Sequence, residues 1–162
     1  MERFVSTFTN KIDAKGRVSV PAQFRAVLDR DGYRAGDAVG IYCYPSLDAP
    51  ALDCGGERLV QKVDALLSDL PDYSDERDEL SVALYGDSRT LAIDGDGRIV
   101  LPEEFRSHAE LSNRATFVGL GDKFQIWQPE QFDERRKRAR EKVQEHRKLF
   151  GAGRRPDQGG AE

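Results

Sequence analysis

The sequence predicts a mixed α+β protein with a mainly β core, in which two copies of one unit complete a shared β-barrel. Three observations lead to this prediction: a motif that occurs twice, strand-like segments around each copy, and a highly charged helical segment late in the chain. A single copy with a few short strands cannot bury its apolar face alone. Two copies in one chain are therefore expected to pair about a pseudo-two-fold axis.

The duplication becomes clear when "KIDAKGRVSVPAQFR" (11–25) is aligned with "AIDGDGRIVLPEEFR" (92–106) at an offset of 81. The identical pairs are Ile12/Ile93, Asp13/Asp94, Gly16/Gly97, Arg17/Arg98, Pro21/Pro102, Phe24/Phe105 and Arg25/Arg106. Val18 and Ile99 also match in kind. The matches are spread evenly and without gaps, which indicates an internal repeat rather than low complexity.

Each copy is expected to begin with a strand that runs into a tight turn. Segments 4–8 ("FVSTF") and 89–93 ("RTLAI") are rich in β-branched and aromatic residues, which favour strands. The turns follow as "DAKG" and "DGDG", where Gly16 and Gly97 supply the positive φ that such turns require.

A second strand and a short helix complete each copy. "RVSVP" and "RIVLP" have the composition of strands, and Pro21 and Pro102 stand where the first turn of a helix tolerates proline. Helices are therefore expected over 21–31 and 102–111, the first of them ended by Gly32.

Further strands and helices are expected after each copy. The strands lie at about 38–44, 51–54, 115–120 and 124–128, and the helices at 57–70, about 75–85 and 129–150. One face of the first of these helices is apolar at helical spacing, with Leu59, Val63, Leu66, Leu67 and Leu70. The last helix has only a thin stripe of Phe132, Ala139, Val143 and Phe150, which predicts one docking face and an otherwise solvated surface.

These elements divide the chain into five predicted segments. They are repeat 1 (7–58), a helical connector (59–87), repeat 2 (88–131), a C-terminal basic helix (132–150) and a disordered tail (151–162). The tail is rich in glycine, which is typical of disorder.

The charge of the chain is distributed unevenly. Segment 134–155 holds ten Lys and Arg against three Glu, a net of +7, so the rest of a chain with overall net charge −4 carries −11. A chain with this asymmetry can meet phosphate locally while it stays acidic overall.

Other features of the sequence indicate a cytoplasmic protein. No run approaches the ~18 apolar residues of a membrane span, and the start "MERFVSTFTNKID" has no apolar core of a signal peptide. Cys43 and Cys54 have no metal-binding spacing and are expected to be packed, reduced thiols rather than a disulfide or metal ligands.

The repeated motif resembles a known superfamily. Asp-x-x-x-Arg, followed by a strand and Pro-x-x-[Phe/Tyr]-Arg, is similar to the AbrB/SpoVT superfamily of swapped-hairpin β-barrels. The two copies "DAKGR" and "DGDGR", together with "VGLGDKFQIWQPEQF" (118–132), resemble the MraZ family in particular. This resemblance covers roughly residues 1–145. It implies a duplicated swapped-hairpin (SpoVT-AbrB-like) β-barrel with flanking helices and a C-terminal charged helix.

The resemblance also implies a function. MraZ proteins are sequence-specific, DNA-binding transcriptional regulators that bind promoter direct repeats, typically as repressors of the division and cell-wall operon that contains their own gene. They form ring-shaped homo-oligomers and associate with the nucleoid. The implied partners are double-stranded DNA and further copies of this chain, with no membrane, no small-molecule substrate and no cofactor or metal.

The first turn is the best candidate for a DNA contact. Lys15 and Arg17 flank Gly16 at a hairpin tip, so two cations are expected to project from a rigid base. Arginine can bind guanine O6 and N7 or a phosphate, and lysine acts as a point charge. Arg3 and Lys11 are expected on or beside the neighbouring strand, where they would extend the patch.

The acidic residues of the motif are assigned to orientation. Asp13 repels phosphate, so it is expected to orient Arg17 or the turn, and Asp94 takes the same position in the second copy. An alternative interpretation is that Asp13 and Arg17 form only a structural ion pair across the hairpin.

The second copy departs from the first in its charge. Asp96 replaces the lysine, so "DGDGR" has two acids, one arginine and a net charge of −1. A loop of this charge should not approach phosphate closely. The first copy is therefore expected to bind DNA and the second to complete the barrel and the ring. Arg98 is retained, so a partial contact by Arg98 stays open as an alternative.

Two other features allow more than one interpretation. The basic helix is expected to pack against a neighbouring subunit and to attract DNA mildly, with direct DNA contact as the alternative. Phe124 and Trp127 resemble an aromatic platform for single strands, but no basic residue lies between them, which favours core or interface packing.

Competing classes of function are disfavoured by the sequence. An enzyme is not expected, because no catalytic Ser/His/Asp order is supported and "GLGDKF" (119–124) lacks the ending and following helix of a phosphate-binding loop. Two rival functions are compatible with the same fold. One is an antitoxin-like protein with a protein partner, and the other is a scaffold ring with incidental DNA binding.

Overall fold

The computed structural model describes residues 2–151, which form two compact units that meet in sequence at Pro129. The first unit contains both repeats and the connector between them. The helix α5 (Pro129–His146) begins at that proline, as the sequence predicts, and the rest of it belongs to the second unit. The predicted tail, 151–162, lies outside the described residues except for Gly151.

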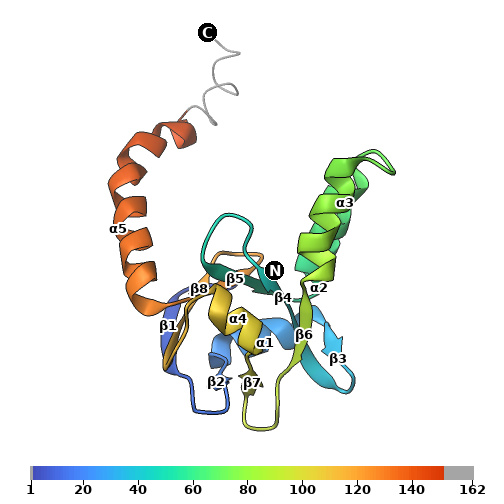
Figure 1. Cartoon of the computed structure of the whole chain (residues 1–162). Coiled ribbons are helices and arrows are strands. Elements are labelled where there is room, and N and C mark those ends of the chain that lie inside the picture. The colour runs from blue at the N-terminus through green and yellow to red at the C-terminus, as the bar shows by residue number, and fades with distance from the viewer. Residues whose placement is uncertain (1, 152–162) are drawn as a thin grey trace. The chain divides into compact units, whose positions relative to one another are not determined.

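Antiparallel strands form the centre of the first unit (Figure 1). The main sheet has the order β1 (Thr7–Lys11), β8 (Arg114–Gly119), β9 (Phe124–Trp127), β5 (Ala51–Gly55), β4 (Ala38–Pro45) and β3 (Arg34–Ala35), and β6 (Arg89–Ala92) also pairs with β4. A separate ribbon pairs β2 (Arg17–Ser19) with β7 (Arg98–Val100). The mixed α+β class is confirmed. The predicted barrel closure is not found, because β1 and β3 end the path of described strands without pairing with each other.

The two repeats exchange strands. β1 of the first repeat pairs with β8 of the second, with Lys11 opposite Arg114. β6 of the second repeat pairs in turn with β4 of the first, with Ala92 opposite Gly40. Neither repeat therefore forms its sheet alone, which agrees with the physical reason inferred for the duplication.

The helices of the first unit differ from the predicted ones mainly at their ends. They are α1 (Ala22–Asp31), α2 (Glu57–Ser68), α3 (Asp75–Ser81) with the π-helical turn η1 (Val82–Gly86), and α4 (Glu103–His108). Gly32 ends α1 in the left-handed conformation at φ +88°, as predicted. The predicted helix 102–111 ends early, and Glu110 beyond it has a positive φ of +56°.

The predicted strand at 4–8 is wrong in its first half. Ser6 has a φ of +78°, and regular pairing begins only at Thr7. Phe4 is buried instead, and its backbone exchanges hydrogen bonds of 2.8 and 2.9 Å with Gly121. The chain passes so close to Gly119 that a Cβ there would lie 2.5 Å from the Phe4 carbonyl carbon. Only glycine at 119 allows this crossing.

The main core is aromatic and draws on both repeats. Phe24 of α1 packs against Phe4 and Phe124, with ring centroids 5.3 and 4.9 Å away. Phe124 and Trp127 are buried, which confirms the packing that the sequence favours over an exposed aromatic platform. Cys43 and Cys54 are free, buried and directly opposite each other on β4 and β5, with their sulfur atoms 3.1 Å apart.

A second core joins the α2–α3 arm to β4. Leu59, Val63 and Leu67 of α2 pack there with Tyr42 and Tyr44. Of the predicted apolar face, Leu66 is instead 61% exposed. None of the helices in residues 2–151 is long and apolar enough to cross a membrane.

Candidate functional site

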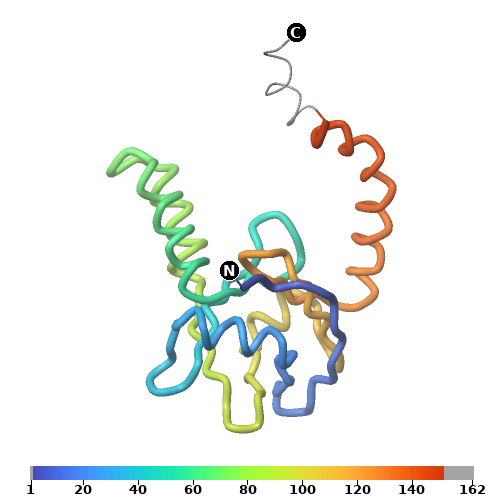
Figure 2. The backbone as a smooth tube through the Cα atoms, turned by 180° about the vertical axis from the view of Figure 1, so that it is seen from behind, coloured from blue at the N-terminus to red at the C-terminus, as the bar shows by residue number. Residues whose placement is uncertain are grey.

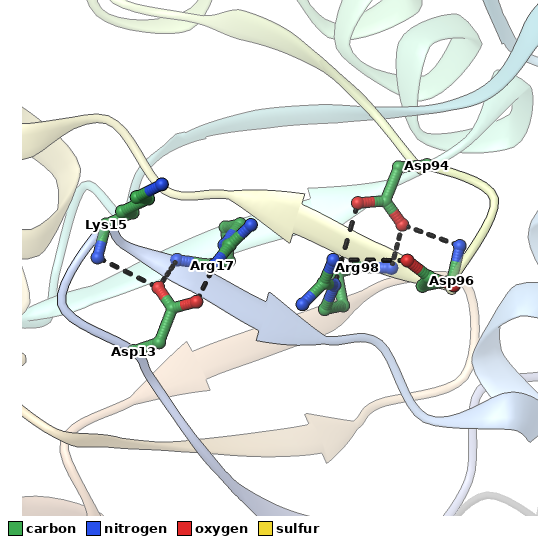
Figure 3. A network of polar contacts seen from close by, with 6 residues as sticks. All are labelled: Asp13, Lys15, Arg17, Asp94, Asp96 and Arg98. Atoms are coloured by element: carbon green, nitrogen blue, oxygen red, sulfur yellow. Dashed lines mark hydrogen bonds and ion pairs between the residues drawn. The ribbon is translucent and has the colours of Figure 1, made fainter.

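The two repeated turns lie side by side at one end of the first unit (Figures 1 and 2). The β2–β7 ribbon holds them there, because Arg17 lies opposite Val100 and Arg98 lies opposite Ser19 in its register. The two motif arginines are thus on adjacent strands that run in opposite directions, and Figure 3 shows both between the two turns.

The first turn is organised by the carboxylate of Asp13. Its Oδ1 accepts hydrogen bonds of 2.9 Å from the backbone N–H groups of Lys15 and Arg17. Its Oδ2 accepts a hydrogen bond of 2.6 Å from Arg17 Nε. A backbone bond of 3.0 Å from the Gly16 N–H to the Asp13 carbonyl closes the turn, with Gly16 at φ +82°.

The second turn has the same backbone but different side-chain partners. Asp94 Oδ1 accepts bonds of 2.9 Å from the N–H groups of Asp96 and Arg98, and Gly97 takes φ +80°. Two carboxylates hold the Arg98 side chain, with Nε 3.7 Å from Asp94 Oδ2 and Nη2 3.2 Å from Asp96 Oδ2 (Figure 3). Arg98 Nε is also buried without a hydrogen-bond partner.

This difference makes the two turns chemically unequal. The Arg17 side chain is 35% exposed and is paired with a single carboxylate, that of Asp13. Lys15 is exposed at the tip and forms no ion pair within the described part of the chain. The first turn therefore presents one free cation and one singly paired guanidinium, whereas the second presents a guanidinium held by two acids.

The turn geometry also lowers the pKa values of its acids. Backbone hydrogen bonding from Arg17 is the largest cause that holds the pKa of Asp13 below its usual 3.8. Backbone hydrogen bonding from Arg98 does the same for the pKa of Asp94, and the charge of Arg17 across the ribbon contributes. Both carboxylates are therefore ionised at neutral pH.

The other predicted contact residues separate into two places. Lys11 is exposed at the end of β1 that leads into the first turn, close in sequence to Lys15. Arg3 lies before the other end of β1, where its charge acts on Asp122, and Figure 2 shows the start of the chain away from the turns. The prediction that Arg3 extends this patch is corrected, because β1 separates it from the turns.

Two arginines that contact the turn glycines were not among the residues predicted from the sequence. Arg25 and Arg106 are one of the identical pairs of the repeat, which is the signal that could have identified them. A Cβ on Gly16 would lie 3.3 Å from Cζ of Arg106, and a Cβ on Gly97 would lie 2.8 Å from Cζ of Arg25. Each arginine thus contacts the turn of the other repeat.

Charged side chains of both signs lie at the two turns. Among residues 2–151, no group of three or more His, Cys, Asp and Glu is placed to hold a metal ion. The side chains at the tip are cations and the acids that orient them.

Comparison with known proteins places these turns in a family context. A family model described as "MraZ protein, putative antitoxin-like" matches residues 84–149. Curated relatives carry the name "Transcriptional regulator MraZ". One from Xanthobacter autotrophicus is 51% identical over 152 residues, 94% of either chain. One from Azorhizobium caulinodans is 49% identical over 153 residues, again 94% of either chain, and one from Rickettsia akari is 37% identical over 147 residues, 91% of this chain and 95% of its own.

Proposed function

Because this chain belongs to the MraZ family, we propose that it is a sequence-specific, DNA-binding transcriptional regulator. The observation that carries the proposal is the first turn, where Asp13 fixes Arg17 and Lys15 extends as an exposed cation. A guanidinium held in one orientation can bind two acceptors of a guanine edge, and a lysine can add a phosphate contact.

The proposed contact is asymmetric. Asp13 holds Arg17 through Nε, which leaves the two terminal nitrogens of its guanidinium for DNA. Arg98 is held by two acids, and Asp96 adds a negative charge where phosphate would approach. The first turn is therefore assigned to DNA recognition and the second to the frame that supports it.

The proposed target is a set of direct repeats in the promoter of the division and cell-wall operon that contains the protein's own gene, where the protein acts as a repressor. The test is fluorescence anisotropy on DNA from upstream of that gene, with intact and with scrambled repeats, over a salt series. Intact repeats should bind more tightly by at least about 10³-fold, the lower range for specific sites. Equal binding of both DNAs at all salt concentrations would contradict sequence-specific regulation.

The salt series also tests which residues contact phosphate. Lys15→Ala should weaken binding to intact and scrambled DNA alike and reduce the slope of log K against log salt by about 1. Lys62→Ala is a matched control, because Lys62 is an exposed lysine of α2 that pairs with Asp122 and not with either turn. An unchanged slope for Lys15→Ala would remove Lys15 from the interface.

We also propose that the chain acts as a ring-shaped homo-oligomer associated with the nucleoid. One chain offers one favourable turn, whereas several turns on a rigid ring that meet several repeats gain ~10²–10⁴ in apparent affinity. Light scattering should give a mass of several chains, and a tandem array should bind far more tightly than one isolated repeat. Equal affinity for both DNAs would contradict this avidity.

A further inference from the structure

Two arginines lie against the glycines of the two turns, and each arginine comes from the opposite repeat. Arg106 of α4 lies against the first turn, where a Cβ on Gly16 would be 3.3 Å from both its Cζ and Nε. Arg25 of α1 lies against the second turn, where a Cβ on Gly97 would be 2.5 Å from its Nη1. Both glycines are buried, so the guanidinium groups cover them.

Each arginine is fixed by its own repeat. Arg106 Nε donates a hydrogen bond of 3.0 Å to the carbonyl of Leu101, and Arg25 Nε donates one of 3.1 Å to the carbonyl of Val20. These bonds lock the planar groups against the adjacent turn, because a guanidinium has few orientations once one N–H is held.

Backbone hydrogen bonds complete the crosswise connection. The Leu101 N–H donates to the Gly16 carbonyl over 2.9 Å, and the Val20 N–H donates to the Gly97 carbonyl over the same distance. Residues 101 and 106 of the second repeat therefore contact the first turn at Gly16, while Asp13 bonds to the backbone N–H groups of the same turn.

We propose that Arg106 is the positioning residue of the DNA-binding turn: the second repeat, which has the acidic tip, orients Lys15 and Arg17 of the first. Arg25 plays the corresponding part for the acidic turn 94–98. This assignment gives the second repeat a task in recognition although its own tip repels phosphate. Its DNA-binding part rests on the function proposed above, but the crosswise bracing does not.

The bracing is tested first, by hydrogen–deuterium exchange of the full chain followed by mass spectrometry. Arg106→Ala should speed exchange in peptides that cover 13–17 about tenfold and leave 94–98 unchanged, because the covered turn opens locally. Arg25→Ala, the matched control, should give the reverse pattern. Faster exchange in both turns, or in neither, would overturn the crosswise bracing. Should Arg106→Ala unfold the chain, Arg106→Lys, which keeps a long side chain but lacks the planar group that covers Gly16, is read in the same way.

The role in recognition is tested by a double-mutant cycle on intact-repeat DNA. Arg106→Ala should weaken binding about tenfold in the wild-type background and less than about twofold when Arg17 is already alanine, since coupled residues are not additive. Arg25→Ala should change binding by less than about twofold. A full tenfold loss in the Arg17→Ala background would show that Arg106 contacts DNA directly and would overturn a positioning role.

Arg106→Lys separates geometry from charge. Lysine keeps the positive charge but lacks the planar group that covers Gly16. Binding should therefore stay as weak as in Arg106→Ala, and restored binding would overturn the proposal. If the exchange pattern is crosswise but the wild-type chain does not prefer the repeats, the bracing stands and the proposed function fails.

Discussion

At the residue scale, one aspartate in each turn binds both the backbone of the turn and the motif arginine. Asp13 accepts bonds from two backbone N–H groups and pairs with Arg17, which orients the guanidinium without burying it. The ion pair itself is exposed and contributes little to stability. Its value is geometric, since the turn and the arginine are fixed by the same carboxylate.

The lowered pKa values of Asp13 and Asp94 predict how stability responds to acid. A carboxyl group with a pKa lower in the folded than in the unfolded chain contributes stability above its ordinary pKa of 3.8. That contribution is lost as the pH falls through the lower folded value. Thermal melts at pH 7 and pH 3 should therefore show a smaller acid-induced decrease in melting temperature for the Asp13→Ala/Asp94→Ala variant than for wild type.

The control for this prediction is Asp48→Ala, an exposed aspartate outside both turns. It should retain the full acid sensitivity of the wild type. An equal decrease in melting temperature for the double variant and the wild type would mean that the two carboxylates do not stabilise the folded turns.

At the element scale, a polar network joins β5 to β9 of the main sheet. Asp53, only 5% exposed, accepts a bond of 2.7 Å from Gln125 Nε2 and one of 3.1 Å from Lys123 Nζ. Gln125 Oε1 in turn accepts the indole N–H of Trp127 over 2.9 Å. The network fixes the register of two strands that belong to different repeats.

Removal of this carboxylate should destabilise the first unit. Asp53→Ala leaves the partly buried amide of Gln125 without its acceptor, and hydrogen bonds to a charged group contribute about 1.5–3 kcal/mol. We expect urea denaturation to show a loss of about 2 kcal/mol, with no change for Asp48→Ala. A loss below about 0.5 kcal/mol would mean that solvent replaces the network.

At the scale of the whole molecule, duplication separates two tasks that identical subunits would have to share. Both turns keep the same backbone, the same glycine conformation and the same carboxylate bonds. The charge at the tip differs, with Lys15 in one copy and Asp96 in the other. One repeat is therefore free to become acidic at its tip while it still supplies the strands and the brace of the other.

The separation in sequence between contacting residues explains what could be predicted from the sequence. The repeat, the turns and most helices depend on residues close in sequence, such as Gly16 and Gly32, so local patterns predicted them. The open sheet, the position of Arg3 and the contact of Arg106 with Gly16 depend on pairing between distant segments. The positive φ of Ser6, which shortens β1, likewise follows from the crossing at Gly119, a contact that no local pattern indicates.

The short strand β3 was missed for a related reason. Its two residues, Arg34 and Ala35, become a strand only by pairing with Val39 and Ala38 across a turn that includes Gly36 at φ +62°. Two residues are too few for a period-2 pattern, so only the glycine of the turn pointed to a hairpin.

The central claim is that the first turn binds DNA and the second does not, and one comparison tests it most directly. Wild type, Arg17→Ala and Arg98→Ala are titrated with intact-repeat DNA at one salt concentration and followed by fluorescence anisotropy. Arg17→Ala should lose about fivefold or more in affinity, the lower value of a bidentate base contact, and Arg98→Ala less than about threefold, the range of a minor coupling. Equal losses for the two variants, or no loss for either, would contradict the asymmetric assignment of the two turns.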